Sequence, residues 1–394
     1  MEISSIMFAL LRSEIQETGL GEGVKNFITS EALPALFALS KKHDLAHLVG
    51  DALDRNGLLS EDSEMRKRFL RERSMAVYRY EQQQYDFEQI CDTLEDEKLP
   101  FLPLKGSVLR GYYPEPWMRT SCDIDILVQA ERLDKAARVL CEQLGYTRAE
   151  QPTSNELSLH TQSGVHIELH FDLTDGGLNE CGREILSNIL AYTGPTAGNA
   201  CHLQISDDVF YFYHIAHMAK HFEHGGCGVR PFLDLWILNH RAGVDKQGGE
   251  TLLQQNGLFT FAKACEKLSE SWFGSADYDD VGRQMEDYLL VGGTYGTIEN
   301  LVSIQQAKKG GKVKYLLSRI FISNKELRVK YPKLNDRPWL APVYHVKRWL
   351  KPLTDKKTRK RSMHELEKTS NVTQDEKQAQ ETLLQRLGLK SEGK

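Results

Sequence analysis

The sequence predicts an α+β protein that is mostly helical overall, in which helical lobes at both ends flank a small α/β sheet domain. Apolar residues recur at helical spacing over residues 1–98 and in several segments after residue 176. Between them, short apolar segments bounded by proline, glycine and polar residues follow the order strand, helix, strand, helix, hairpin. We therefore expect an N-terminal helical lobe (1–98), the sheet domain (99–175), a helical domain with a histidine-rich helix (176–307), and a basic helix with a charged tail (308–394).

Composition narrows the class of protein. With 394 residues, 40% hydrophobic and 27% charged, the chain is typical of soluble globular proteins with a large core. Its net charge of -5 argues against a protein that coats nucleic acid through bulk charge. The seven cysteines form no Cys-x-x-Cys pair, so neither a disulfide framework nor a zinc ribbon is indicated. The N-terminus is typical of an amphipathic helix rather than a signal peptide, and no apolar run approaches a membrane span, so we expect a cytoplasmic protein.

The elements of the sheet domain are predicted in order. Residues 101–104 are expected to form a strand, 107–112 a helix, 122–128 a strand, 130–144 a helix that stops at Gly145, and 156–160 with 165–173 a hairpin. The lobe before them contains a long helical segment at about 61–98, and we expect this lobe to carry no chemistry of its own. After a turn at 175–177, further segments are predicted: helices at 207–224, 232–239 and 259–268, a surface linker at 308–312, and helices at 343–350 and 373–387.

Three carboxylates are the centre of the predicted site. Because side chains alternate along a strand, Asp123 and Asp125 lie on one face of it, and Glu168 adds a third carboxylate from the hairpin. Neighbouring like charges repel, so such a group is expected where a cation offsets the repulsion, and oxygen ligands suit Mg²⁺. The triplet suggests a magnesium site that handles phosphates. The alternative is an edge strand whose outward face is acidic.

The segment before the aspartates supplies groups suited to phosphate. Gly106 and Ser107, at a predicted helix start, offer backbone amides and a hydroxyl, and Lys105 and Arg119 add positive charge nearby. An ordinary helix start has the same Gly-Ser pattern.

Taken together, Lys105-Gly106-Ser107, Arg119, Asp123-Ile-Asp125 and Glu168 resemble the polymerase β-type nucleotidyltransferase superfamily, whose signature is Gly-Ser, a loop, Asp-x-Asp and a later acidic strand. More narrowly, the chain is similar to a bacterial family of uncharacterised nucleotidyltransferases. The resemblance implies that the three carboxylates are metal ligands, that Gly106 and Ser107 hold the nucleotide phosphates, and that two Mg²⁺ ions are used, with Mn²⁺ as an alternative.

The helix predicted at 207–224 carries one stripe of basic side chains: His214, His217, Lys220, His221 and His224. Three interpretations stay open. In the first, the stripe faces the cleft and binds a triphosphate or an anionic acceptor. In the second, it is structural and lies at a domain interface. In the third, it holds zinc through His214, His217 or His221 with His224 or Cys227.

Two further features have alternatives. Arg230 and Asp234 follow a glycine-rich turn, and their spacing resembles a recurring element beside the active site of the family; an ordinary i, i+4 ion pair is the alternative. Residues 347–361 hold eight Lys or Arg against one acid, Asp355. This segment is either a contact for nucleic acid or an acidic partner, or a solvated helix face with a disordered connector, and no other segment gives a nucleic-acid signal.

We therefore expect an enzyme that moves a nucleoside monophosphate from an NTP to an acceptor hydroxyl of a small molecule, protein or RNA end, releasing pyrophosphate. The hypotheses against it are a non-catalytic nucleotide- or partner-binding module on the same fold, and a zinc protein built on the histidine stripe. The expected catalytic and metal-binding residues are Asp123, Asp125 and Glu168. The expected nucleotide-binding residues are Lys105, Gly106, Ser107, Arg119, His217, Lys220, His221, Arg230 and Asp234.

Overall fold

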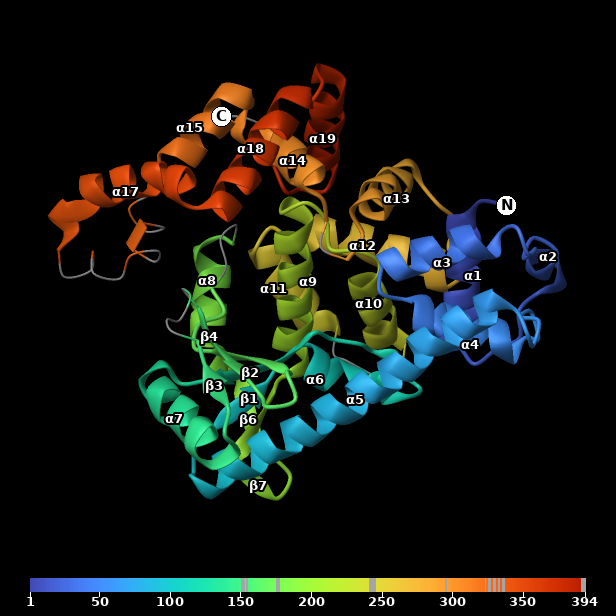
Figure 1. Ribbon diagram of the computed structural model, residues 1–394, viewed down its shortest axis with the longest axis horizontal. Helices are drawn as coiled ribbons and strands as arrows, with labels where there is room; N and C mark the ends of the chain where they lie inside the picture. The colour runs from blue at the N-terminus through green and yellow to red at the C-terminus, as the bar shows by residue number, and fades with distance from the viewer. Residues whose placement is uncertain are drawn as a thin grey trace.

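The computed structural model describes residues 1–390 except 150–152, 154, 175–177, 241–245, 295, 323, 325, 326, 329, 330, 332, 333, 335 and 336. A central mixed sheet lies among helices from both ends of the chain, so the predicted α+β class is confirmed (Figure 1). The predicted turn at 175–177, and the domain boundary placed there, lie outside the described residues. The division into four domains stays a prediction.

The N-terminal lobe consists of helices α1 (Ile3–Ile15), α2 (Glu22–Lys25), α3 (Leu33–Lys42), α4 (Ala46–Arg55) and α5 (Glu64–Asp96). The long helix α5 begins at Ser63, whose side chain accepts a hydrogen bond from the Arg66 amide at 3.2 Å. Its 33 residues span about 50 Å. That length lets α5 run from the lobe to the far side of the sheet (Figure 1).

The sheet has seven strands among the described residues, in the order β3-β4-β5-β2-β1-β7-β6. Strands β1 (Phe101–Pro103), β2 (Asp123–Val128), β4 (Glu156–His160) and β5 (His166–His170) confirm the predicted strands and hairpin. Strands β3 (Thr147–Arg148), β6 (Thr193–Thr196) and β7 (Asn199–Ile205) were not predicted. The strands β6 and β7 lie in a segment expected to be helical. They are half exposed and lack a regular apolar alternation, and β7 joins the sheet through its pairing with β1, about 100 residues away in sequence.

Helices cover one face of the sheet. The short helix α6 (Gly106–Leu109) follows β1, and α7 (Leu133–Leu144) follows β2 and ends at Gly145, which adopts a left-handed φ of 68° as predicted. Leu94 of α5 and Leu140 of α7 belong to the same buried apolar cluster as Ile124 and Ile126 of β2. Asp123 and Asp125 therefore face the opposite side of the sheet.

The helices that follow strand β5 are α8 (Glu180–Ser187), α9 (Asp207–Glu223), α10 (Arg230–His240), α11 (Lys246–Gln255), α12 (Phe259–Phe273) and α13 (Asp280–Gly292). Residues of α9 and α10 line a cavity on that opposite side of the sheet, together with Asp123 and Asp125. The N-terminal lobe packs directly on these helices, because Phe8 of α1 stacks on Trp272 of α12 with ring centroids 4.5 Å apart. The predicted helices at 207–224, 232–239 and 259–268 are confirmed as α9, α10 and α12.

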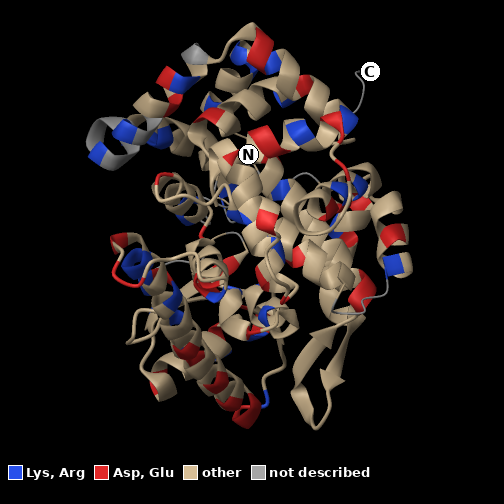
Figure 2. Cartoon of the chain, turned by 90° about the vertical axis from the view of Figure 1, so that its right-hand side faces the viewer, with Lys and Arg blue, Asp and Glu red and all other residues tan. Residues whose placement is uncertain are grey.

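The C-terminal group contains α14 (Ile298–Lys309), α15 (Lys312–Ile320), α17 (Ala341–Thr354), α18 (Lys356–Asn371) and α19 (Gln374–Arg386). The linker predicted at 308–312 is only the short break between α14 and α15, and the connector after α17 is helical rather than disordered. Basic and acidic residues are interspersed along the helices (Figure 2). Among the helices that the structure describes, none combines the length and the apolar character needed to cross a membrane.

Candidate active site

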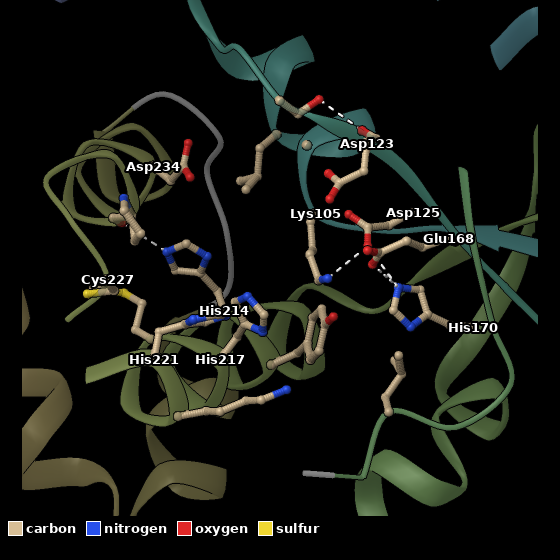
Figure 3. Close-up of a pocket in the computed structure, with 18 of the residues that line it drawn as sticks. Lys105, Asp123, Asp125, Glu168, His170, His214, His217, His221, Cys227 and Asp234 are labelled. Atoms are coloured by element: carbon tan, nitrogen blue, oxygen red, sulfur yellow. Dashed lines mark hydrogen bonds and ion pairs between the residues drawn. The ribbon is translucent and has the colours of Figure 1, made fainter. Parts of the chain in front are cut away.

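Strand register brings the three predicted carboxylates together. Strands β2 and β5 are parallel neighbours in which Asp125 is paired with Glu168 and Asp123 with His166. Residues paired across two strands point to the same face of the sheet, so the side chains of Asp123, Asp125 and Glu168 share one face. Figure 3 shows them converging from these two strands.

Two cationic side chains contact Asp125, which is 3% exposed. Lys105 Nζ and His170 Nε2 each lie 2.8 Å from Asp125 Oδ1. Burial alone would raise the pKa of Asp125, but the charge of Lys105 and the hydrogen bond from His170 outweigh it and hold this pKa well below its usual range. Asp125 is therefore ionised at neutral pH.

His170 links two of the carboxylates. Its Nε2 also lies 3.3 Å from Glu168 Oε2. Burial acts to lower the pKa of His170, but hydrogen bonds with Asp125 and Glu168 raise it to about 9. His170 was not among the predicted site residues, although the spacing of His166, Glu168 and His170 on one strand places all three on the same face.

Asp123 is less compensated than Asp125. Burial, together with the negative charges of Asp125 and Glu168, raises the pKa of Asp123 to about 6. The carboxylates of Asp125 and Glu168 thus concentrate negative charge beside Asp123. A bound cation would offset this repulsion, so the site favours cation binding.

The donor atoms fit a divalent metal. Two groups of three side chains each place their ligand atoms within 4.8 Å of one another: Asp123 with His166 and Glu168, and Asp125 with Glu168 and His170. The carboxylate oxygens suit Mg²⁺ or Mn²⁺. An imidazole binds a metal only in its neutral form, so His170, which its two carboxylate partners keep protonated, is not a metal donor in this arrangement. In the part of the chain that the structure describes, no such group includes a histidine of α9, so the predicted zinc alternative has no donor set there.

Lys105 approaches Asp125 from an unusual backbone conformation. Its φ is 42°, in the left-handed region that residues with a side chain rarely adopt. Such a conformation costs on the order of 1–3 kcal/mol and is found disproportionately at functional sites. Here it precedes α6 and aims the ammonium group at the carboxylates (Figure 3).

A cavity of about 530 Å³ separates the carboxylates from α9 and α10. This volume is in the range of ligand sites. Of the twelve predicted site residues, all but Ser107 line it. Ser107 instead lines a second cavity of about 210 Å³, beside Phe87 and Tyr112.

The stripe on α9 divides into three kinds of residue. His214 reaches the cavity wall but is buried, and its Nε2 lies 3.1 Å from the Pro231 carbonyl oxygen, which is a structural contact. His217, Lys220 and His221 line the cavity, with the His217 and His221 ring centroids 4.4 Å apart. His224 is exposed and does not belong to the lining.

Burial changes the charge of this wall. It lowers the pKa of His214, and burial together with the charges of Lys105, His221 and Lys220 lowers the pKa of His217 well below its usual value. Both rings are therefore neutral at neutral pH.

A buried ion pair holds the loop before β2. Arg119 donates from Nε and Nη2 to the two carboxylate oxygens of Asp234 at 2.9 and 3.0 Å, and the Tyr113 hydroxyl donates to Asp234 Oδ1 at 2.7 Å. Arg230 pairs with Asp44 instead, at 2.9 Å. The alternative in which Arg230 and Asp234 pair with each other is therefore wrong.

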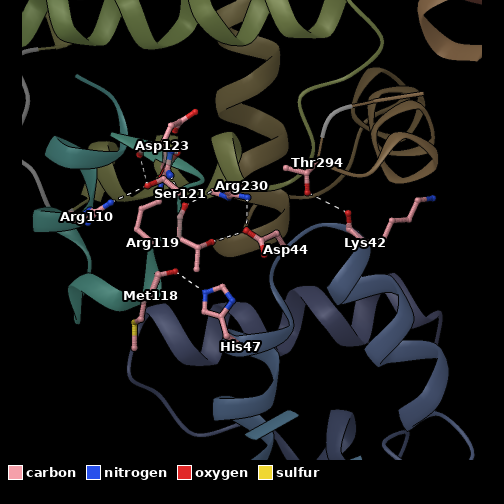
Figure 4. A network of polar contacts seen from close by, with 12 residues as sticks. Lys42, Asp44, His47, Arg110, Met118, Arg119, Ser121, Asp123, Arg230 and Thr294 are labelled. Carbon is pink, nitrogen blue, oxygen red and sulfur yellow. Dashed lines mark hydrogen bonds and ion pairs between the residues drawn. The ribbon is translucent and has the colours of Figure 1, made fainter. Parts of the chain in front are cut away.

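The N-terminal lobe contributes to the same loop (Figure 4). Asp44 Oδ2 accepts hydrogen bonds from Arg230 and from the Thr120 hydroxyl at 2.9 and 2.8 Å, and His47 Nε2 lies 2.9 Å from the Met118 carbonyl oxygen. Gln83 of α5 donates to the Ser121 carbonyl oxygen at 3.0 Å. The lobe therefore fixes residues 118–121 shortly before Asp123, which is a positioning role; that the lobe carries no chemistry of its own stays a prediction.

Comparison with known proteins gives one match. A family model described as "Uncharacterised nucleotidyltransferase" matches residues 29–274, more than half of the chain. The matched range includes all seven described strands, α9 and α10. No curated protein and no solved structure matches the chain.

Proposed function

The chain belongs to the family of uncharacterised nucleotidyltransferases, and from that membership we propose that it transfers a nucleoside monophosphate from an NTP to an acceptor hydroxyl, with divalent metal and release of pyrophosphate. One observation carries the proposal. The register of β2 and β5 aligns Asp125 with Glu168 beside Asp123, at the edge of a cavity whose opposite wall carries Lys220. Anionic phosphates fit between a metal-binding wall and a cationic one.

Asp123, Asp125 and Glu168 are the proposed metal ligands, in agreement with their shared face and their donor atoms. A divalent cation held there would neutralise phosphate charge and lower the pKa of the acceptor hydroxyl. The residues of the chain itself keep the carboxylates in place: His170 bridges Asp125 and Glu168, and Lys105 offsets part of their charge.

The α9 wall is the proposed phosphate site. Lys220 supplies charge, and the cavity-facing rings of His217 and His221 supply ring nitrogens for hydrogen bonds to phosphate oxygens. Gly106 packs closely against Ser121, since a Cβ there would lie 3.2 Å from the Ser121 Cβ. Because Gly106 also lines the cavity, its backbone is a proposed contact for the nucleotide phosphates.

Arg119, Arg230 and Asp234 are positioning residues in this proposal rather than phosphate ligands. The Nε and Nη2 groups of Arg119 both donate hydrogen bonds to Asp234, and the Arg119 side chain is only 11% exposed. Through Thr120, whose carbonyl oxygen accepts hydrogen bonds from Arg119 and Arg230 at 2.7 and 2.8 Å, these side chains fix the entry to β2.

The test is nucleotide binding and turnover by the full chain. Each of ATP, GTP, CTP and UTP is offered with Mg²⁺, with Mn²⁺ or with a chelator, while calorimetry with a non-hydrolysable analogue measures binding and a coupled assay measures pyrophosphate. The variants are Asp123→Asn and Asp125→Asn, with Asp134→Asn as the matched control because Asp134 is 77% exposed on α7.

We expect one or more NTPs to bind only with metal. Each site variant should lower pyrophosphate release by about 100-fold or more, whereas the control should behave as the unaltered chain. Nucleotide binding that needs the metal but gives no pyrophosphate with any acceptor extract would favour a non-catalytic binding module. Absence of nucleotide binding, or binding indifferent to metal and to both variants, would contradict the proposal altogether.

A further inference from the structure

The C-terminal helices expose an apolar face that the site does not use. On α17 and the turn before it, five large apolar side chains are between 42% and 70% exposed: Trp339, Val343, Val346, Trp349 and Leu350. Residues 339, 343, 346 and 350 follow the spacing i, i+4, i+7 and i+11, so they lie along one side of the helix. Exposure of a contiguous apolar stripe to water is unfavourable, and such a stripe marks an interaction surface.

Helix α15 extends this face. Val313, Leu317, Ile320 and Phe321 are between 45% and 69% exposed. The two helices are joined where the Trp349 Nε1 donates to the Ile320 carbonyl oxygen at 2.9 Å and the Phe321 and Trp349 rings lie 5.6 Å apart. We call the exposed apolar residues of both helices the apolar face.

Positive charge borders the apolar face. Lys347 and Lys351 are exposed on α17, each one residue after an apolar residue of the stripe, Val346 and Leu350, and therefore lie on the flank of the stripe. The sequence continues with further basic residues, so 347–361 holds eight Lys or Arg against the single acid Asp355. Figure 1 places α17 at the outer edge of the molecule, away from the sheet.

The combination of charge and apolar surface selects one kind of partner. Nucleic acid would use the lysines but leave the apolar stripe in water. A second copy of the chain would cover the stripe but bring two basic flanks together, which costs free energy. An anionic lipid surface satisfies both, because its headgroups attract lysine and its acyl boundary accepts valine, leucine and tryptophan.

We propose that α15 and α17 dock the protein on membrane surfaces rich in anionic lipid. Helix α17 has 14 residues, fewer than the roughly 20 that a helix needs to span a bilayer, so it lies in the interface rather than crossing. Trp339 and Trp349 then sit at headgroup depth, where tryptophan is enriched. Lys347 and Lys351 face the phosphates.

The experiment is co-sedimentation of the full chain with phosphatidylcholine vesicles that contain either no anionic lipid or about 30% phosphatidylglycerol. We expect binding to the anionic vesicles, weakened by added salt. Joint replacement of Lys347→Gln and Lys351→Gln should lower the partition coefficient roughly 30-fold. The matched control removes two exposed charges from α5, Lys67→Gln with Arg71→Gln, and should leave binding unchanged.

A second variant tests the apolar contribution. Val343→Ser with Leu350→Ser should lower partitioning at least about tenfold, whereas Val291→Ser, at a residue 57% exposed on α13, should not. Circular dichroism confirms that each variant is folded. A shift of tryptophan emission to shorter wavelength on vesicle addition, lost in the Val343/Leu350 variant, is the second readout.

Several results would overturn the proposal. Equal binding to neutral and anionic vesicles would rule out a role for the lysines. Absence of binding to both kinds of vesicle would rule out docking on a membrane. Light scattering that shows a dimer, converted to monomer by Val343→Ser with Leu350→Ser, would assign the apolar face to a second copy instead. Retained binding to an acidic protein fraction without vesicle binding would assign it to a protein partner.

Discussion

Replacing Asp234 with asparagine should destabilise the fold severely, although the change removes a single charge. Asp234 is 1% exposed and accepts hydrogen bonds from Arg119 at 2.9 and 3.0 Å and from Tyr113 at 2.7 Å. Asp234→Asn leaves the Arg119 guanidinium buried without its counter-charge. Breaking a buried ion pair from one side costs about 3–5 kcal/mol, which is a large share of a typical unfolding free energy of about 5–15 kcal/mol.

The assay is urea unfolding followed by tryptophan fluorescence and by circular dichroism, so that two probes report whether one transition is seen. Asp134→Asn is the matched control. Its carboxylate also contacts an arginine, Arg148 at 2.8 Å, but the two side chains are 77% and 39% exposed. This surface pair should contribute no more than about 0.5 kcal/mol.

A double variant isolates the reason for the loss. Arg119→Met with Asp234→Leu removes both charges, so it should destabilise the chain by less than the sum of the two single changes. Equal effects of Asp234→Asn and Asp134→Asn would refute the reasoning, and so would strict additivity in the double variant. Either result would mean that the Arg119–Asp234 pair does not hold the loop as the geometry indicates.

Three further predictions concern other parts of the molecule. Burial lowers the pKa of His43 to about 4, below its unfolded value, so the contribution of His43 to stability is full above the unfolded pKa and falls as the pH is lowered. The unfolding free energy of the unaltered chain relative to that of His43→Gln should therefore drop by about 2 kcal/mol between pH 7.5 and pH 5, as measured by urea unfolding at the two pH values. Lys220→Met should weaken binding of an NTP analogue in calorimetry by roughly 10- to 100-fold, and Lys67→Met should not; equal effects would contradict a phosphate role for α9. Gly228→Ala should lower the unfolding free energy measured in urea by about 1–3 kcal/mol more than Gly57→Ala does. The two glycines have similar φ values, 69° and 66°, but only at Gly228 would a Cβ lie 3.0 and 3.1 Å from backbone atoms.

Much of the fold was predictable because its signals are local. Helical periodicity located α5, α9, α10 and α12, and Gly145 marked the end of α7. The strands β6 and β7 were missed, since their residues are half exposed without regular apolar alternation, and the pair joins the sheet only through the contact of β7 with the distant β1. Periodicity cannot report a pairing made with a distant segment.

The site was predicted in part for the same reason. Alternation along β2 and β5 identified the faces of Asp123, Asp125 and Glu168. Neither the contact of Lys105 with Asp125 nor that of His170 with the same carboxylate follows from local pattern, although His170 lies on the predicted strand.

The sequence by itself determined which residue types alternate along two strands and therefore which carboxylates can share a face. Only the tertiary structure decided that β5 lies beside β2 in the register that aligns Glu168 with Asp125. It also decided that Asp44 and His47 hold the loop before Asp123, and that burial leaves His217 neutral. The physical reason is that hydrogen-bond partners and desolvation are set by segments distant in the chain, whereas side-chain alternation is set by the backbone geometry of each strand.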